Sequence, residues 1–489
     1  MNPVSTPFGR RTLLLGSLGG ALAGTFGLSA CSSGSGSGSD LQITLAGPNQ
    51  WNSDGASFGK PWEELIARFH ADEPGISIKT VVLPLKEFKQ TLATQLSAGS
   101  APELVFSQAA HEPHMIYPLT DALKKPNPYV EGNKEWLDLF DQRYFAPGLP
   151  NVVSTTSGDF EYIPFNLVAV GVYYNTEAFA KAGVTAPIAT FADLLAACPK
   201  LIAAGYTPLA MDNSDLGVGW TVKTIANMML DKYFDKINKY DAKGNEGQAE
   251  YLSPKGKSWA RAILTGDISA HGTPEVAESL RLLKQLFDAG ATKNWTGVAS
   301  SSGSVVNLRD FQAGKAAMAW GVPFGYGALG DLQGKVSSMP FPTITASSSP
   351  LSTGAPARFG TSVGGTSYMI PSTLDGKHRD AAVKFLQWMS VPAKIQPWLD
   401  ATGGIPAVKG ARVPKGVAGM ISGVWSEPMR MGGLPSGPAG TTELSLYDGY
   451  LLGTKPLDQE LDHLQDMWTK STRELVKKNG WDKEDWAKA

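Results

Sequence analysis

Residues 41–46 (LQITLA), 76–82 (ISIKTVV) and 103–106 (ELVF) decide the fold class of this chain. The first two segments alternate with a period of two, and the third is a short apolar run, so all three are predicted β-strands. Residues 60–72 and 85–98 carry apolar side chains at helical spacing, and Pro74-Gly75 and Gly99 end the two helices. The order strand, helix, strand, helix, strand predicts a parallel sheet with helices on its faces.

The loops after these strands are the first places where binding residues are expected, because ligands of such sheets lie beyond the carboxyl ends of the strands. These loops are residues 49–52, 83–87 and 107–111. Residues 160–175 (FEYIPFNLVAVGVYYN) then form a long predicted extended segment, rich in β-branched and aromatic side chains.

The rest of the chain continues the mixture of helices and strands. Thr190 with Asp193 predicts the start of a helix, and Cys198 lies on its apolar stripe as an expected inert core thiol. Residues 308–326 predict a helix, a buried strand and an aromatic loop, and residues 337–360, rich in Ser, Pro and Thr, predict a long loop. Further helices are predicted over residues 220–234, 274–289, 379–390 and 457–478.

The amino-terminal residues are typical of an export signal. Arg10-Arg11 precede a loosened apolar run over residues 12–28, which is short for a membrane span. The arginine pair resembles a twin-arginine signal, although Gly9 stands where Ser or Thr is usual. The exit, LSAC at 28–31, resembles a bacterial lipobox, so residues 1–30 are the expected signal and Cys31 the expected lipidated residue. Residues 31–39 would then be a flexible tether, and the alternative is an ordinary signal with a chance cysteine at its end.

Composition excludes several classes of protein. Basic and acidic residues number 43 and 45 without any basic cluster, which argues against nucleic-acid binding because that needs a concentrated basic face. The 489 residues are too many for one core and favour two or three domains. The chain also holds 13 tryptophans, whose rings serve either as core or as platforms for sugars.

Four stretches, in this order, resemble a known family. They are residues 62–106, with EPGI and AGSAPELVF; residues 162–183 (YIPFNLVAVGVYYNTEAFAKAG); residues 311–326, with F-x-x-G-x-A-A-M and G-V-P-F; and residues 364–407, from Gly-Gly to Gly-Gly-Ile-Pro-Ala. Together they are similar to the extracellular solute-binding proteins of family 1, the carbohydrate-type receptors of ABC importers.

The resemblance implies an α/β fold of the two-lobe, periplasmic-binding-protein-like type II, with crossover strands between the lobes and a ligand cleft at their interface. One lobe would take residues 40–165 and 370–420, and the other residues 166–369 and 421–489. Crossovers are expected near residues 165–169, 362–368 and 420. A binding protein of this kind closes on its ligand by a hinge motion and delivers it to a permease.

The implied partners are a small-molecule ligand, expected to be a sugar or oligosaccharide, and the membrane subunits of an ABC permease. The protein is expected to be a monomer, held by its lipid at the extracytoplasmic face of the cytoplasmic membrane, without cofactor, metal or catalytic activity. A sugar needs aromatic platforms for its C–H faces and polar groups for its hydroxyls. The candidate ligand contacts are Asn49, Trp51, Glu87, Gln108, Asn166, Asn213, Trp220, Trp320, Phe324, Tyr326, Gly365, Trp425 and Glu443.

Other interpretations stay open. A receptor for a glycerophosphodiester, a peptide or a polyamine would share the fold, and Arg358 and Lys86 are the candidate partners of a phosphate. Residues 360–364 (GTSVG) match the G-x-S-x-G motif of serine hydrolases at Ser362, but extended chain follows where that motif needs a helix. His111 and His114 offer imidazoles without the spacing of a helical zinc site, and Gly256-Lys257-Ser258 is an incomplete phosphate loop expected at the surface.

Overall fold

The structure is a computed structural model that describes residues 41–48, 58–84, 87–147, 149, 157–241, 244–247, 254, 256–301 and 303–488. Its strands are β1 Leu41–Pro48, β2 Ile76–Leu83, β3 Leu104–Phe106, β4 Ile163–Pro164, β5 Asn166–Val168, β6 Gly171–Asn175, β7 Thr207–Ala210, β8 Ala316–Gly321, β9 Val336–Met339, β10 Ser362–Val363, β11 Ser367–Met369 and β12 Ile405–Pro406. Its α-helices are α1 Lys60–Asp72, α2 Phe88–Ser97, α3 Thr120–Leu123, α4 Thr176–Ala182, α5 Phe191–Ala203, α6 Asp215–Met229, α7 Phe234–Ile237, α8 Gly256–Leu264, α9 Pro274–Gly290, α10 Leu308–Gln312, α11 Gly376–Met389, α12 Pro392–Thr402, α13 Asp448–Leu451 and α14 Leu457–Asn479.

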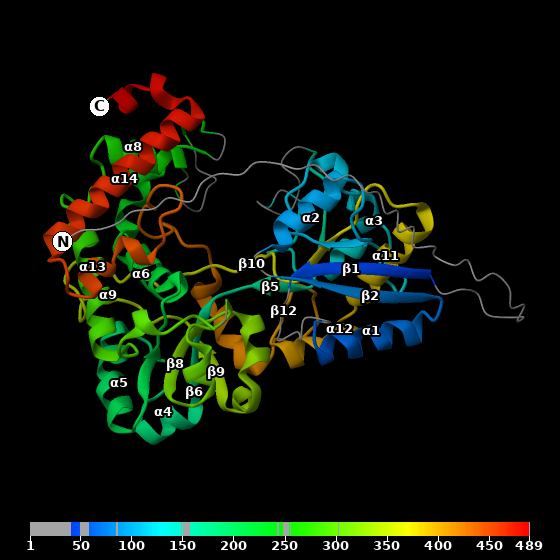
Figure 1. Cartoon of the computed structure of the whole chain (residues 1–489), viewed down its shortest axis with the longest axis horizontal. Helices are drawn as coiled ribbons and strands as arrows, with labels where there is room; N and C mark the ends of the chain where they lie inside the picture. The colour runs from blue at the N-terminus through cyan, green and yellow to red at the C-terminus, as the bar shows by residue number, and fades with distance from the viewer. Residues whose placement is uncertain are drawn as a thin grey trace, which may run out of the picture. The chain divides into compact units, whose positions relative to one another are not determined.

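The first sheet has the strand order β2-β1-β3-β11-β4. Strands β1, β2 and β3 are parallel, as predicted, and β11 and β4 add antiparallel pairings at one side. Helices α1 and α12 run along one face of this sheet and α2 covers the other (Figure 1). Helix α1 begins with a proline in its first turn and buries Trp62, Leu65 and Phe69, which confirms its predicted apolar stripe.

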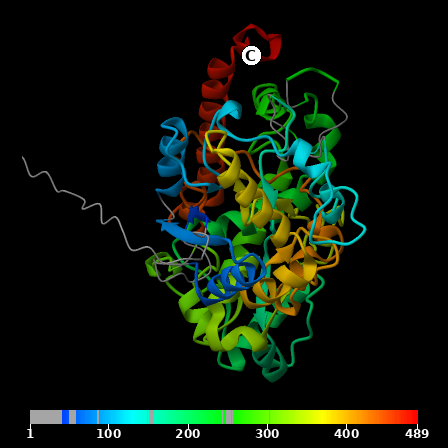
Figure 2. The same cartoon turned by 90° about the vertical axis from the view of Figure 1, so that its right-hand side faces the viewer.

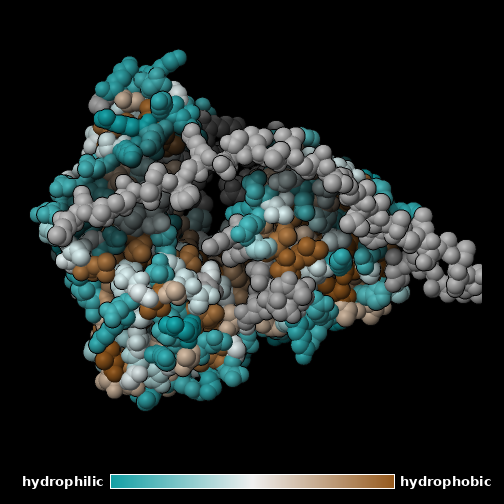
Figure 3. Space-filling model, in the orientation of Figure 1, coloured by the Kyte–Doolittle hydropathy of each residue, from teal (hydrophilic) through white to brown (hydrophobic). Residues whose placement is uncertain are grey.

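The second sheet has the order β7-β8-β6-β9. Helix α9 packs against both α5 and α6. The side chain of Thr190 accepts a hydrogen bond from the Asp193 backbone N–H, so the predicted helix start is confirmed. The C-terminal helix α14 packs against α8, and the carboxyl end of the chain lies beyond it (Figure 1 and Figure 2). Where α14 faces the viewer of Figure 3 its surface is hydrophilic, as its exposed polar residues require.

A small sheet with the order β10-β5-β12 lies at the chain crossings between the two larger sheets. The predicted extended segment 160–175 is therefore not one strand but three, since β4 belongs to the first sheet, β5 to the small one and β6 to the second. Strand β10 pairs with β5 through Ser362 opposite Val168, and β12 pairs with β5 through Pro406 opposite Asn166. These are the crossovers expected near residues 165–169 and 362–368.

Several boundaries differ from the prediction. The loop predicted over 337–360 begins with β9, because residues 336–339 complete the edge of the second sheet beside β6. Helix α6 starts at Asp215 and ends at Met229, not at 220 and 234, since its first turns carry small residues without a clear apolar spacing. Helix α11 starts at Gly376, where the Asp375 side chain accepts from the His378 backbone N–H. Strand β11, Ser367–Met369, pairs with β3 in the first sheet. It therefore lies with the first sheet, a few residues before the lobe boundary expected at residue 370.

The buried apolar side chains form two separate cores. One surrounds the first sheet, where it includes Trp62 and Phe69, and continues through the crossovers to Tyr173 of the second sheet. The other lies around the second sheet and includes Trp320 and Trp468. Phe324 packs against both cores. Among the described residues, none of the helices combines the length and apolar character that crossing a bilayer requires.

Candidate functional site

A pocket of about 350 Å³ lies at the crossovers, where three segments distant in sequence meet. Its lining is Val168, Ala169, Val170, Phe359, Gly360, Thr361, Ser362, Pro428, Met429 and Gly432. None of these side chains is charged. The hydroxyl of Thr361 is buried and has no hydrogen-bond partner among the residues that the structure describes. The pocket thus offers apolar walls with hydroxyl and backbone polar groups.

Trp425 holds the three segments of this crossover pocket together. Its indole N–H donates to the carbonyl of Val170 at 2.7 Å. Its own carbonyl accepts from the backbone N–H groups of Phe359 at 3.0 Å and Gly360 at 3.2 Å. The ring is 1% exposed. Trp425, a candidate ligand contact, therefore stands behind the pocket wall in this structure.

An aromatic cluster, defined here as Trp220, Trp320, Phe341, Phe359 and Trp425, adjoins the pocket. Trp320 stacks on Phe341 at a centroid distance of 5.4 Å, and Phe359 lies 5.5 Å from Trp425. Trp220 meets the edges of Trp320 at 6.2 Å and Phe359 at 6.4 Å. Trp320 is fully buried and its indole N–H donates to Thr221 at 2.9 Å, whereas Trp220 is half-buried. Of the candidate platforms in this cluster, Trp220 is the one with exposed ring surface.

Asn166 and Gly365 join β5 to the chain between β10 and β11. Asn166 is 1% exposed, and its side-chain oxygen accepts a hydrogen bond from the backbone N–H of Thr366. A Cβ on Gly365 would collide with that same oxygen. The glycine is required by a close approach of backbone to side chain at the crossover. Gln108, exposed in the loop after β3, donates to the Gly364 carbonyl at 2.9 Å and brings a predicted binding loop to this point.

Phe324 and Tyr326 follow β8 in the 3₁₀ turns Pro323–Lys335. The ring of Tyr326 fits against Gly403 and Gly416, where a Cβ at either position would collide with it. Its hydroxyl donates to the Gln333 carbonyl at 2.8 Å, and burial raises the pKa of this phenol. Tyr326 is thus held by protein on several sides, whereas Phe324 is half-buried where the two cores meet.

Glu443 precedes the 3₁₀ turn Leu444–Leu446 and packs against α6 at Gly219, next to Trp220 in sequence. Its stem packs against Gly219, where a Cβ would come within 3.2 Å of Glu443 Cγ. Burial raises the pKa of the Glu443 carboxyl, the charge of Lys223 opposes this and that of Asp215 adds to it. The next backbone N–H, that of Leu444, donates to Asp215 at 3.0 Å and so fixes the segment on the first turn of α6.

The remaining candidates are dispersed. Glu87 is exposed at the start of α2. Asn213 is engaged locally, since its backbone N–H donates to the Val298 carbonyl at 2.9 Å and its side chain accepts from the Ser300 N–H at 3.1 Å. Asn49, Trp51 and the candidate lipidation residue Cys31 lie outside the described residues, as does Lys86.

The residues of the alternative interpretations have other partners. Ser362 is exposed on β10. His378 and His463 follow it in the sequence and could supply the base of a serine hydrolase, but His378 faces Asp375 at 2.9 Å and His463 lies 3.4 Å from the Ser445 carbonyl. His111 pairs with Glu161 at 2.9 Å, and no group of three or more metal-ligating side chains occurs in the described part of the chain. Arg358 is ion-paired with Glu427.

Two further expectations from the sequence concern Cys198 and Ser258. Burial raises the pKa of the Cys198 thiol to about 11, which agrees with an inert core cysteine. Ser258 was expected at the surface but is fully buried, because its hydroxyl accepts from the backbone N–H groups of Lys239 and Tyr240.

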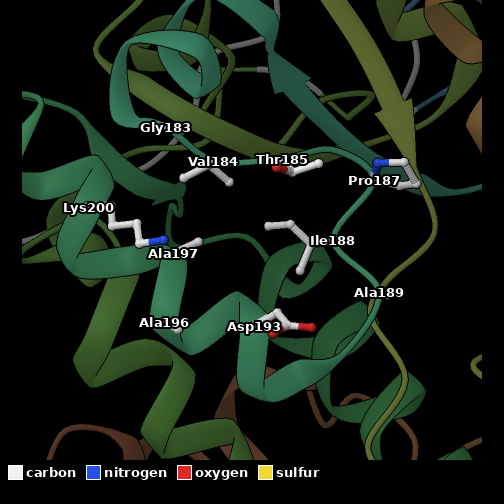
Figure 4. Close-up of a pocket in the computed structure, with 10 residues that line it drawn as sticks. All are labelled: Gly183, Val184, Thr185, Pro187, Ile188, Ala189, Asp193, Ala196, Ala197 and Lys200. Carbon is white, nitrogen blue, oxygen red and sulfur yellow. The ribbon is translucent and has the colours of Figure 1, made fainter.

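A second cavity, of about 280 Å³, lies between the 183–189 loop and α5 (Figure 4). Its charged lining residues are Asp193 and Lys200. The carboxylate of Asp193 already accepts the Thr190 hydroxyl at 2.6 Å within the helix cap. This cavity lies apart from the crossovers and holds none of the candidate ligand contacts.

Two α/β sheets joined by crossover strands, with a pocket at the crossings, define the periplasmic-binding-protein-like class of ligand receptor. A family model described as bacterial extracellular solute-binding protein matches residues 52–394. The chain therefore belongs to the bacterial extracellular solute-binding protein family.

Solved structures with this fold cover nearly the whole chain. RafE from Streptococcus pneumoniae has a TM-score of 0.55 at 19% identity, with 90% of this chain and 100% of that chain covered. A protein from Listeria monocytogenes in complex with cycloalternan has a TM-score of 0.56 at 16% identity, with 90% and 99% covered. Their agreement confirms the predicted two-lobe α/β fold.

The alignments to curated relatives cover a smaller share of this chain. A putative binding protein of Brucella abortus is 28% identical over 272 residues, which are 55% of this chain and 56% of the relative. The chain thus matches little more than half the length of that relative. The sn-glycerol-3-phosphate-binding periplasmic protein UgpB of Escherichia coli is 24% identical over 372 residues, 74% of each chain.

Proposed function

We propose that this protein is the receptor of an ABC importer and that it captures a neutral sugar or oligosaccharide between its two lobes. The observation that carries the proposal is the uncharged crossover pocket beside an aromatic cluster. Apolar walls and rings suit the C–H faces of a sugar, and hydroxyls and backbone groups suit its polar edge. Structural neighbours described as binding raffinose, maltose and chitin oligosaccharide support the same ligand class.

Capture by this receptor uses the small β10-β5-β12 sheet as a hinge, and the closed form is what the permease subunits read. The lobes comprise about residues 40–165 with 370–420 and residues 166–369 with 421–489, with the boundary shift at β11 noted above. The protein binds and releases its ligand unchanged, and works as a monomer.

The same proposal places the receptor at the extracytoplasmic face of the cytoplasmic membrane, anchored through lipid on Cys31. One acyl-modified cysteine with a small-residue tether would keep the body near its permease. Expression with a radiolabelled fatty acid tests the anchor: label and membrane association are expected for the wild type and lost in Cys31→Ser. Label retained in Cys31→Ser would refute this site of attachment.

Thermal unfolding against a ligand panel tests the ligand class. The panel contains raffinose, maltotriose, xylotriose and chitotriose, with sn-glycerol 3-phosphate, glycerophosphocholine, a tripeptide and spermidine beside them. A ligand at a hundred times its Kd stabilises the fold by about 2.7 kcal/mol, which moves the midpoint by several degrees. A shift with a neutral saccharide supports the proposal. The absence of any such shift refutes it.

A glycerol phosphate is the second candidate ligand, favoured by the 24% identity to UgpB. Such an anion needs a free cation in the cleft. Arg358, the described cation that the sequence suggested for this role, is already paired with Glu427. A shift with sn-glycerol 3-phosphate alone would establish it and would retain the fold and the receptor role.

A further inference from the structure

Lys223 on α6 and Glu443, which packs against α6 at Gly219, carry opposite charges and have no partners of their own in the described part of the chain. They do not form an ion pair with each other. Neither head group has a hydrogen bond or ion pair with any other residue that the structure describes. Lys455 and Glu460, by contrast, form an ion pair at 3.6 Å, so Lys223 and Glu443 differ in having their donors and acceptors unused.

Helix geometry brings the two charges to the same patch as an aromatic ring. The stem of Glu443 packs against Gly219, which is four residues before Lys223. The side chains of Glu443 and Lys223 therefore lie at the same face of α6. Trp220 is three residues before Lys223 and borders the same face. Its half-buried ring meets Phe359, which lines the crossover pocket.

Residues 432 and 433 connect the surroundings of Lys223 with the lining of the pocket. Gly433 approaches the stem of Lys223 so closely that a Cβ there would lie 2.8 Å from Lys223 Cγ. The preceding residue, Gly432, lines the crossover pocket. The chain segment that lines the pocket therefore also packs against the stem of Lys223.

We propose that Trp220, Lys223 and Glu443 form a subsite for one neutral sugar unit with two adjacent hydroxyl groups. The ring of Trp220 contacts the C–H face, the Lys223 ammonium donates to one hydroxyl, and the Glu443 carboxylate accepts from the other. This inference rests on the proposed function and adds to it Lys223, which the sequence did not indicate, and a reason for the ligand to be uncharged.

Charge decides between the ligand classes at this subsite. A phosphate would be attracted by Lys223 but repelled by the carboxylates of Glu443 and Asp215. A polyamine would be repelled by Lys223. A neutral diol satisfies both partners at once, because each hydroxyl can donate and accept. The neutral diol makes charge-assisted hydrogen bonds to both head groups and meets no like charge, so this subsite favours a sugar over either charged class.

The test compares conservative variants with matched controls. Glu443→Gln and Lys223→Met keep size while removing charge, and the exposed Glu474→Gln and Lys315→Met are their controls. Calorimetric titration uses whichever of raffinose, maltotriose, xylotriose or chitotriose shifts the wild-type midpoint most. Each subsite variant is expected to weaken binding by about ten- to a hundredfold, and each control by less than about twofold. Ligand-free unfolding midpoints equal to the wild type show that the variants fold.

The outcomes separate the subsite from the function. If the wild type binds a neutral saccharide and neither subsite variant changes its affinity, the subsite is wrong and the proposed function stands. If no neutral saccharide binds, the proposed function fails, and the subsite with it. If sn-glycerol 3-phosphate or glycerophosphocholine binds, and Lys223→Met weakens it while Glu443→Gln strengthens it, the pair is an anion site and the subsite proposal is overturned.

Discussion

The side chain of His111 links the loop after β3 to the segment that precedes β4. Its Nδ1 lies 2.8 Å from the Ala109 carbonyl and its Nε2 lies 2.9 Å from a Glu161 carboxylate oxygen. Both partners only accept hydrogen bonds, so the two bonds form together only when both ring nitrogens carry protons. The ring therefore joins the loop after β3 to the chain that enters β4 most firmly as a cation.

The pairing of His111 predicts a pH-dependent contribution to stability. The hydrogen bond to Glu161 raises the pKa of His111, burial opposes this, and the Ala109 carbonyl and the charge of Glu112 support it. A raised folded-state pKa means that the stabilisation is present below the unfolded pKa, about 6.5, and is lost as pH rises through the folded pKa. The difference in unfolding free energy between the wild type and His111→Ala should shrink from pH 6 to pH 9.

Urea denaturation at several pH values measures this difference. Glu161→Gln serves as the control, because the His111→Ala effect should lose its pH dependence in that background. A difference that stays constant from pH 6 to pH 9 in the wild-type background would contradict the prediction.

Gly365 carries the second prediction at this scale. Adding a methyl group drives it into the Asn166 side chain, which is 1% exposed and cannot move into solvent. Gly365→Ala should lower the free energy of unfolding by about 1–3 kcal/mol or more, as overpacking of a close-packed interior does. Gly297→Ala, whose Cβ would meet nothing within 4 Å, should have little effect. Equal effects of the two substitutions in urea denaturation would rule out this role of Gly365.

At the scale of elements, the 3₁₀ turns after β8 are fastened to α12 and to the turn Lys415–Ile421 through Tyr326. Gly416→Ala should cost about 1–3 kcal/mol of unfolding free energy, because its methyl group would overlap the tyrosine ring. In a Tyr326→Ala background the same change should cost much less, since the ring is gone. A double-mutant cycle by urea denaturation measures the coupling. Additive costs would mean that the ring and Gly416 act independently.

Local patterns recovered most elements and missed others for identifiable reasons. Helices α1, α5, α9 and α14 have long apolar stripes, and all were predicted within a few residues. Strand β9 (VSSM) is short and half polar, and only its pairing with β6 shows it to be a strand. Helix α12 contains an internal proline at residue 397, which obscured its pattern.

For the whole molecule, we predict that the two lobes close on a bound saccharide. The small β10-β5-β12 sheet is short, with strands of two and three residues, and joins the two larger sheets, so we expect the hinge there. The radius of gyration of the protein in solution should fall on addition of a saccharide that shifts its unfolding midpoint. Small-angle X-ray scattering measures this, with a saccharide that causes no shift as the control. An unchanged radius with a bound ligand would contradict capture by closure.

The sequence by itself determined the order of helices and strands, the parallel start of the first sheet and the resemblance to solute-binding proteins, because these depend on periodicities and motifs within a few dozen residues. Only the tertiary structure divided residues 163–175 among three sheets, buried Trp320 and Trp425, and placed Glu443 beside Lys223. Such contacts join positions hundreds of residues apart, and burial depends on what the rest of the chain places around a ring. The pocket proposed as the binding site lies at the crossings of the chain, where local pattern carries the least information.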